Sequence, residues 1–201
     1  MVTEYKSKPY EQHRTINMSY LIEWFQINYP QLCKDLLNCN HNASDKSLNP
    51  YHLESDCWSH TMLVCKVAEI YRYGKEVQIS AMLHDIGKPK ARKLNPRNNH
   101  VQFFGHEELS AELAEEVLSK MQKETIVNSN EVYEIKELIR LHSLLHKEPE
   151  PHILFEQFKN NRELYIHLVQ LNQCDHLGRF CKESDPTDKK FNRLMSYSKN
   201  M

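Results

Sequence analysis

Glycine is scarce in this sequence, with only 4 residues among 201. Because strand-rich folds usually place glycine in their turns, the scarcity favours an all-helical fold. The sequence also lacks an excess of charge of either sign, since its formal net charge is −1. A protein that binds nucleic acid over its whole surface is therefore not expected, although a local basic patch is compatible with this charge. The length suits one domain.

Long apolar segments are also missing. No stretch approaches the roughly 20 apolar residues of a membrane-spanning helix, so no membrane contact is expected. The N-terminus, MVTEYKSKPYEQHR, has no apolar segment of the kind that a secretory signal needs. The six cysteines include no C-x-x-C pair. We therefore expect reduced thiols in a cytoplasmic protein and no cysteine zinc site.

Apolar residues recur at helical spacing over most of the chain. The spacing predicts helices over 16–25, 57–73, 75–86, 106–121, 131–145 and 161–177. Pro30 is expected to end the first helix, and Gly87 followed by Pro89 to end the third. The polar segments 38–50 and 90–105 are interpreted as loops. The tail after Cys181 is interpreted as one loosely docked helix.

Metal-competent side chains interrupt the apolar faces of five predicted helices. They are His60, His84, His106, His142 (followed by His146) and Asp175. Burying a carboxylate such as Asp175 on an apolar face is costly unless it is paired, and imidazoles around a cation are one way to pair it. A single histidine on such a face is more often a core residue bonded to a backbone carbonyl. Periodicity alone does not show that the five faces meet.

The sharpest local pattern is AMLHDIGKP at 81–89, where His84 and Asp85 are adjacent at a predicted helix end. Neighbouring residues in a helix point about 100° apart. Both side chains can therefore reach one metal ion only if the ion lies near the helix end, where the backbone turns away.

These motifs resemble the HD superfamily of metal-dependent phosphohydrolases, whose ligand order is H…HD…D. Within it, the sequence is most similar to the HD domain attached to bacterial tRNA nucleotidyltransferases. The matching segments are NPYHLESDCWSHT at 49–61, AMLHDIGKP at 81–89, FFGHEELSAELAEEVL at 103–118, RLH at 140–142 and CDHLGR at 174–179. No nucleotidyltransferase Gly-Ser…Asp-x-Asp signature is visible, so a free-standing HD domain that does not add CCA is expected.

The resemblance implies a compact helical bundle and a metal site. We predict a single HD domain over 1–201, with a motif-bearing core at about 49–180, an N-terminal helical extension at 1–48 and a polar tail at 181–201. The implied ligands of the first metal are His60, His84, Asp85 and Asp175. His106 and His142 are candidates for a second metal or for substrate phosphate. Imidazole and carboxylate ligands suit one or two ions of Mn, Fe, Co, Ni, Zn or Mg.

Other residues have two interpretations each. Lys88 could meet phosphate as a point charge or be a solvated lysine beside a helix end. His52 and Glu54 resemble the family's His-x-Glu element and could act on the leaving group, or could cap a loop. Asp85 could orient a water or bridge two ions, and Arg179 could reach phosphate or form a structural ion pair.

Two further sets of residues receive weaker interpretations. A basic set could form a rim for a polyanionic substrate or be a solvated surface: Lys90, Arg92, Lys93, Arg97 and His100. The remaining histidines are interpreted as surface or structural residues: His13, His41, His152, His167 and His176.

The function expected from the resemblance is hydrolysis of phosphate esters in nucleotides or RNA ends, with 2′,3′-cyclic phosphates favoured. One alternative is a 5′-nucleotidase-type nucleoside monophosphate phosphatase. Many such relatives place a Glu shortly after the His-Asp pair, where this chain has Gly87 and Lys88. Another alternative is a non-catalytic module that binds a nucleotide or RNA, against which the complete ligand set argues. The sequence predicts no oligomeric state.

Overall fold

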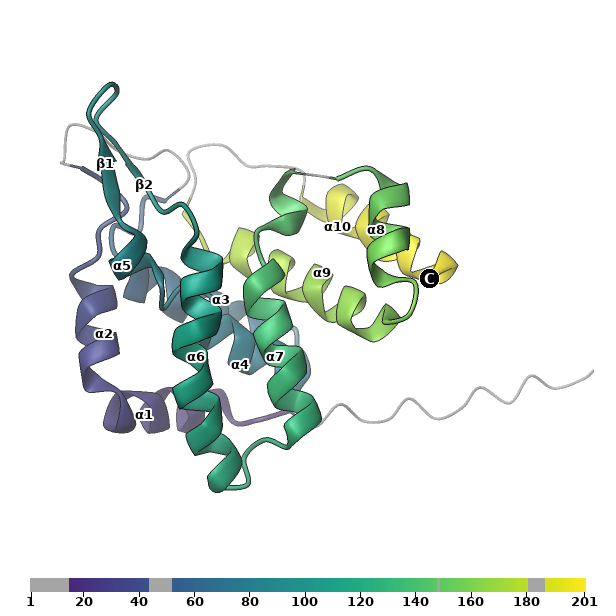
Figure 1. The fold of residues 1–201 in the computed structure, drawn as a ribbon, viewed down its shortest axis with the longest axis horizontal. Coiled ribbons are helices and arrows are strands. Elements are labelled where there is room, and N and C mark those ends of the chain that lie inside the picture. Colours follow the sequence, from purple (N-terminus) through teal and green to yellow (C-terminus); the bar gives the residue numbers. More distant parts are fainter. Residues whose placement is uncertain (1–14, 44–51, 148, 181–186) are drawn as a thin grey trace, which may run out of the picture.

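The computed structural model describes residues 15–43, 52–147, 149–180 and 187–201. These ranges are mostly helical, with one small antiparallel hairpin (Figure 1), so the predicted all-α class is confirmed. The first half contains α1 (Met18–Asn28), α2 (Pro30–Leu37), α3 (Cys57–Ile70), α4 (Lys75–Leu83), α5 (Lys88–Ala91), β1 (Lys93–Asn95) and β2 (His100–Gln102). The second half contains α6 (His106–Lys123), α7 (Ser129–Leu141), the 3-10 turn η1 (Leu144–Lys147), α8 (Pro151–Phe158), α9 (Arg162–Leu177), α10 (Thr187–Tyr197) and the 3-10 turn η2 (Ser198–Asn200).

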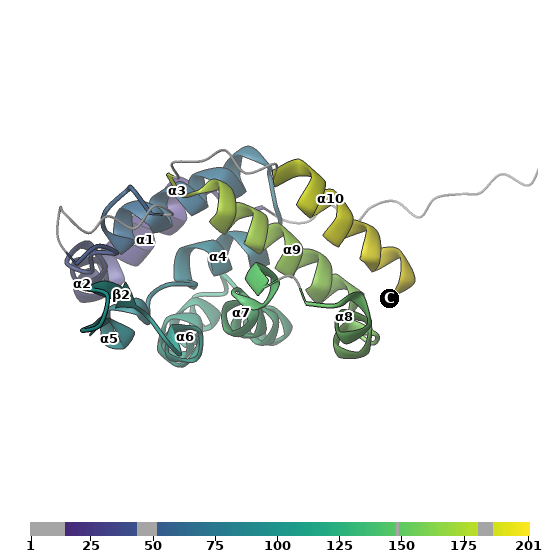
Figure 2. The ribbon, with the colours of Figure 1, turned by 90° about the horizontal axis from the view of Figure 1, so that it is seen from above.

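Helix α4 lies at the centre of the bundle. It packs against α3, α7 and α9, while α6 packs on the outer side of α7 and α10 lies along α9 (Figures 1 and 2). Every residue from Val77 to Leu83 is buried. A helix that is buried all round has no polar stripe, which is why its amphipathic pattern is weak.

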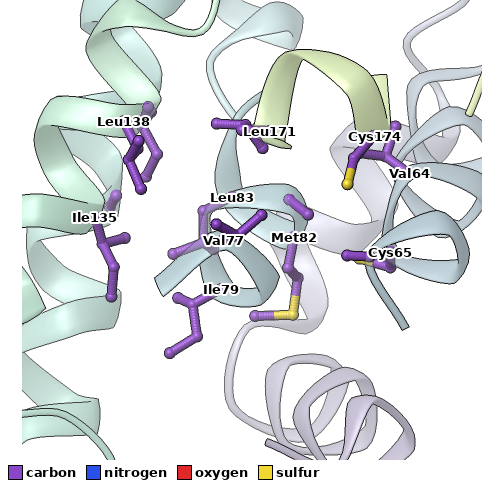
Figure 3. Packing of buried hydrophobic residues seen from close by; sticks show 14 of the residues in the cluster. Val64, Cys65, Val77, Ile79, Met82, Leu83, Ile135, Leu138, Leu171 and Cys174 are labelled. Atoms are coloured by element: carbon purple, nitrogen blue, oxygen red, sulfur yellow. The ribbon is translucent and has the colours of Figure 1, made fainter. Parts of the chain in front are cut away.

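The core fixes the helices that carry the metal-competent residues. Figure 3 shows side chains of α4 between those of α7 on one side and those of α3 and α9 on the other. The labelled residues are Val64, Cys65, Val77, Ile79, Met82, Leu83, Ile135, Leu138, Leu171 and Cys174. Each fully buried aliphatic side chain of this kind stabilises the fold by about 1.5–3 kcal/mol. The ends of α3, α4, α7 and α9 are therefore held at fixed positions relative to one another.

Local polar groups set where several helices begin. Asp56 accepts a hydrogen bond from Ser59 N (2.8 Å) at the start of α3. Asn128 and Glu131 form a capping box at α7, and Asn161 caps α9. These side chains satisfy amide groups that have no partner within the helix.

The structure corrects several predicted boundaries. Pro30 does not only follow the first helix; it begins α2, because a proline at the first helical position gives up no hydrogen bond. The segment 90–105 is not only a loop but contains the end of α5 and the β1–β2 hairpin. Helix α8 was not predicted, and the helix expected over 131–145 ends at Leu141.

The C-terminal helix and the thiols can also be compared with prediction. Phe191 and Leu194 of α10 are buried, so this helix is firmly packed rather than loosely docked.

Five cysteines are buried and free, as expected: Cys33, Cys39, Cys57, Cys65 and Cys174. Cys181, His13 and the predicted loop beyond residue 43 as far as Pro50 lie outside the described residues. Among the described helices none is long and apolar enough to cross a membrane.

Candidate metal centre

The five predicted helix faces meet at one point. His60 lies in the first turn of α3, His84 and Asp85 directly follow α4, His106 begins α6, His142 follows α7, and Asp175 lies near the end of α9. His60, His84, Asp85, His142 and Asp175 are buried and His106 is half-buried. The structure therefore brings together, from five parts of the chain, all six residues that the sequence offered as ligands.

A first group of ligand atoms gathers around the ends of α3 and α4. His60 Nε2 lies 3.0 Å from Asp175 Oδ1 and 3.7 Å from Asp85 Oδ2. His84 Nε2 lies 3.2 Å from the same Asp85 oxygen. One ligand atom from each of His60, His84 and Asp85 falls within 4.8 Å of the others. This spacing suits a single cation with imidazole and carboxylate ligands.

A second group uses the other oxygen of Asp85. His106 Nε2 lies 3.4 Å and His142 Nε2 3.8 Å from Asp85 Oδ1. These three residues also keep their ligand atoms within 4.8 Å of one another. Asp85 therefore presents one oxygen to each group, which is the placement that a carboxylate bridging two ions needs.

Three histidine rings of the site use Nδ1 to donate a hydrogen bond to a backbone carbonyl. Each ring places Nδ1 on the carbonyl oxygen of the residue three positions earlier: His84 on Ala81 (2.9 Å), His106 on Phe103 (2.8 Å) and His142 on Ile139 (2.7 Å). Because a carbonyl only accepts, Nδ1 carries the proton, and Nε2 of a neutral ring keeps a lone pair. Burial lowers the pKa of His142 to about 3, so its ring is neutral.

The Nε2 atoms of these rings point into the same space. His106 Nε2 and His142 Nε2 lie 3.1 Å apart, and when both rings are neutral their lone pairs face each other and repel. His84 Nε2 and Asp85 Oδ1 are buried without a hydrogen-bond partner. Buried polar groups without partners are rare in native proteins and call for an explanation such as an ion. The donor set of these residues fits a divalent metal.

Both buried carboxylates keep their charge. Burial would raise the pKa of Asp85, but the ammonium group of Lys88, together with the rings of His84 and His106 when they carry a proton on Nε2, outweighs burial and holds this pKa well below its usual range. Burial has the same effect on Asp175, and there His146 and His60 outweigh it. Two negative charges are therefore available to a cation at neutral pH.

Glu54 supports His60 from behind. Its Oε1 lies 2.7 Å from His52 Nδ1 and 3.1 Å from His60 Nδ1, and its Oε2 accepts from Phe180 N (3.0 Å). Burial lowers the pKa of His60, but Asp175 and Glu54 outweigh it and raise that pKa to about 9. A carboxylate behind a histidine fixes the ring orientation and makes the facing nitrogen a better ligand.

Comparison with known proteins agrees with this geometry. The profile of the HD domain family matches residues 57–185, which is more than half of the chain. The chain belongs to the HD domain family. A similar curated protein is the CC-adding tRNA nucleotidyltransferase of Thermus thermophilus, at 41% identity over 39 residues. The match covers 19% of this chain and 9% of that protein.

The family assignment gives the buried cluster its chemical class. HD domains are generally metal-dependent phosphohydrolases, and the buried His and Asp groups of this chain fit a metal site of that kind. The family profile ends at residue 185, so it includes the position of Asp175 as well as the His-Asp pair.

Lys88 of this HD domain is buried rather than solvated. Its Nζ lies 2.7 Å from Asp85 Oδ2 and 5.3 Å from the centre of the Phe103 ring. Burial would lower the pKa of Lys88, but Asp85 outweighs burial and raises it. The solvated-lysine interpretation is therefore wrong, and a fixed positive charge lies beside the carboxylate that both groups share.

His41 is a residue of the site that sequence reasoning missed. It is buried, its ring stacks on that of His52 with centroids 4.3 Å apart, and its Nε2 lies 3.3 Å from Lys88 Nζ. Burial and the neighbouring Lys88 lower the pKa of His41 to about 2, so the ring is a neutral acceptor for the ammonium group. The asparagine-rich sequence around it carries no periodic signal that could have revealed this contact.

Two other candidate residues, His146 and Arg179, lie near the end of α9. His146 Nε2 lies 2.9 Å from Asp175 Oδ2, although its place on an apolar stripe was its only feature in the sequence. Arg179 contacts His176 Nδ1, one turn beyond Asp175. In the described part of the chain, no contact joins Arg179 to the ligand cluster.

Gly87 sets the packing between the His-Asp turn and α6. Its N–H donates to Ser110 Oγ (2.9 Å). A Cβ at this position would lie 2.5 Å from Ser110 N and 2.6 Å from His106 O, both backbone atoms. Only glycine lets the two segments approach so closely, and this approach places His106 opposite Asp85.

Proposed function

We propose that this HD domain hydrolyses phosphate esters of nucleotides or RNA ends, with 2′,3′-cyclic phosphates as its favoured substrates. The observation that carries the proposal is the convergence of imidazole nitrogens and carboxylate oxygens around Asp85. Such a set of acceptors suits a divalent cation, and cations in this setting polarise phosphate oxygens.

The ligand roles follow from the two groups. His60, His84, Asp85 and Asp175 would hold one ion, and His106, His142 and the second oxygen of Asp85 would hold another. Mn, Fe, Co, Ni, Zn and Mg all suit imidazole and carboxylate ligands without thiolates. The bound ion would supply Lewis-acid chemistry to the phosphoryl group and lower the pKa of water.

The remaining residues act on the substrate. The ammonium group of Lys88 donates one N–H to Asp85 and one to His41, which leaves a third N–H for a phosphate oxygen. Glu54 holds the Nδ1–H of His52, so His52 Nε2 can exchange a proton with the leaving group. Arg179 would bind phosphate only after releasing His176.

The substrate class is supported by similarity. The matching segments resemble an HD domain of enzymes that act on tRNA, and the name of the Thermus relative also refers to tRNA. The nucleotidase alternative is less well supported, because Gly87 and Lys88 stand where many nucleotidases have a Glu. A non-catalytic binding module would have no need for two complete acceptor groups.

A substrate panel tests the proposal. Turnover of bis-p-nitrophenyl phosphate, 2′,3′-cAMP, 3′,5′-cAMP and nucleoside monophosphates would be measured with Mn²⁺, Ni²⁺, Co²⁺ and Mg²⁺. Wild type, Asp85→Asn and the control Asp35→Asn on α2 would be compared. We expect metal-dependent turnover that Asp85→Asn loses by at least 100-fold and Asp35→Asn keeps. The preferred ester decides between diesterase and nucleotidase, and equal rates in wild type and Asp85→Asn would contradict a hydrolase centred on Asp85.

A further inference from the structure

The hairpin between α5 and α6 extends beyond the helical body (Figure 1). Its register pairs Lys93 with Gln102, Leu94 with Val101, and Asn95 with His100. Opposed residues of an antiparallel pair point to the same face, and successive residues alternate between faces. One face therefore presents Lys93, Gln102, Asn95 and His100, and the other presents Leu94 and Val101.

The hairpin segment carries positive charge only. From Lys88 to His106 the sequence contains no Asp or Glu, in a chain whose total charge is close to zero. Lys90, Lys93 and Arg97 are exposed, and no ion pair involves them among the described residues. Charge of one sign, concentrated on a projecting element, attracts a polyanion.

Arg92 is different from these three cations. Its Nε donates to Asn40 O (3.0 Å) and its Nη2 to Asn42 O (3.2 Å). These bonds attach the segment that carries His41 to the base of the hairpin. Arg92 is therefore part of the support, and three cations remain available for a ligand.

Both ends of the hairpin segment are built into the metal centre. At one end, Lys88 pairs with Asp85; at the other, the carbonyl of Phe103 accepts from His106 Nδ1. The Phe103 ring also lies against Lys88 and His41. A ligand bound in the metal centre that extended outward past Phe103 would therefore run along β1 and β2, towards Lys93 and Arg97.

We infer that the hairpin binds the phosphate backbone of single-stranded RNA whose terminal phosphate ester occupies the metal centre. The inference rests on the proposed function and extends it, because it selects an RNA end over a free nucleotide. A mononucleotide has only the phosphate that enters the centre, so it leaves nothing for Lys93 and Arg97 to bind. Strands rise about 3.3 Å per residue, so the cations from the base to the turn are spread over a length that suits several nucleotides.

Binding at different salt concentrations tests this inference without requiring turnover. The probe is a fluorescein-labelled 12-nucleotide RNA with a 3′-phosphate, measured by anisotropy between 50 and 200 mM KCl. Each phosphate contact to a single strand contributes about −0.7 to the slope of log K against log salt. Three contacts give a slope of about −2, so wild type is expected to lose about 20-fold in affinity over this range.

Two triple variants separate the hairpin from general charge. Lys90→Gln/Lys93→Gln/Arg97→Gln removes the exposed hairpin cations, and Lys123→Gln/Lys159→Gln/Lys199→Gln removes three exposed cations elsewhere. We expect the hairpin variant to bind RNA at least about 10-fold more weakly at 50 mM KCl with a nearly flat slope. The control variant should bind as wild type does. Equal binding by the hairpin variant and wild type, or equal loss in the control, would overturn the inference.

Kinetics distinguish the hairpin inference from the proposed function. If both hold, the hairpin variant turns over 2′,3′-cAMP like wild type but loses kcat/KM on an RNA with a 2′,3′-cyclic end. If no ester is hydrolysed by any protein, the proposed function fails. In that case, salt-dependent RNA binding that the hairpin variant alone loses would still support the hairpin as an RNA-binding element.

Discussion

His106 Nε2 and His142 Nε2 lie 3.1 Å apart while each ring gives its Nδ1–H to a backbone carbonyl. When both rings are neutral, neither facing nitrogen has a proton to offer the other, so the two lone pairs repel unless a cation lies between them. Asp85 Oδ1 lies within 3.8 Å of both nitrogens and adds a third acceptor. This arrangement is the strongest structural argument for an ion at this position.

A bound metal ion should therefore stabilise the fold, and the size of this stabilisation should depend on His106 and His142. A ligand that binds only the native state at 100 times its Kd adds about 2.7 kcal/mol to the free energy of unfolding. We expect Mn²⁺ to raise the Tm of wild type above its value in EDTA. The rise should be clearly smaller in His142→Asn, which differential scanning fluorimetry can measure. An equal rise in both proteins would show that His142 does not contribute to metal binding.

Glu54→Gln should weaken metal binding without unfolding the protein. The carboxylate contacts both His52 and His60, and loss of such support typically costs 10–100-fold in metal affinity or activity. Calorimetric titration with Mn²⁺ measures the change. Glu69→Gln, at the far end of α3, is the matched control and should keep wild-type affinity. Unchanged affinity in Glu54→Gln would mean that Glu54 only caps its loop.

His41→Phe should reduce activity through Lys88. The substitution keeps a flat ring beside His52 but removes the nitrogen that faces Lys88 Nζ, which leaves that buried cation short of a partner at a cost of about 1–3 kcal/mol. We expect kcat/KM to fall about 10-fold, equivalent to about 1.4 kcal/mol in the transition state. His152→Phe on α8 is the control, since His152 is exposed. If both variants have wild-type kcat/KM, His41 does not position Lys88.

Substitution at two glycines should have unequal effects. At Gly87 a Cβ would lie under 3 Å from three backbone atoms, none of which can rotate away, so Gly87→Ala should destabilise the protein by about 3 kcal/mol. Gly105 has φ +75° but open space around it, so Gly105→Ala should cost about 1 kcal/mol of backbone strain. Urea denaturation measures both values. A larger loss of stability in Gly105→Ala than in Gly87→Ala would contradict the close contact between the His-Asp turn and α6.

The His167–Glu134 pair, away from the metal centre, should make stability depend on pH. Burial lowers the pKa of His167, but Glu134 outweighs burial and raises it. A raised native pKa contributes stability that is complete below the unfolded value and is lost as pH rises through the native value. Glu134→Gln should therefore destabilise the protein more at pH 5.5 than at pH 8.5 in urea titrations. Glu156→Gln on α8 should show no such trend, and a pH-independent effect of Glu134→Gln would contradict the pair's role.

Helical periodicity places the metal-competent residues on apolar faces, and the resemblance to the HD superfamily implies that they form one ligand set. His60, His142 and Asp175 occur on apolar stripes, and the His-Asp pair ends a helix at a recognisable Gly and Pro. The faces that carry them had to be buried, so these residues had to point inward. That they meet at one point required the packing of α3, α7 and α9 around α4, which no local pattern contains.

The supporting residues could not be predicted in the same way. His41 contacts Lys88 across 47 positions of sequence and lies outside any helix, so no periodic signal marks it. The strands of the hairpin are three residues each, too short for an alternating pattern to distinguish them from a loop. The sequence pattern shows Pro30 only as the end of one helix, although a proline can equally begin the next helix.

Titration of EDTA-treated protein with Mn²⁺ tests the central claim most directly. Asp85 offers one oxygen to each acceptor group, so its loss should affect both ions. Wild type and the control Asp35→Asn are predicted to bind two ions per chain, and Asp85→Asn none in the micromolar range. Binding by Asp85→Asn with the stoichiometry and affinity of wild type would contradict a metal centre built on Asp85.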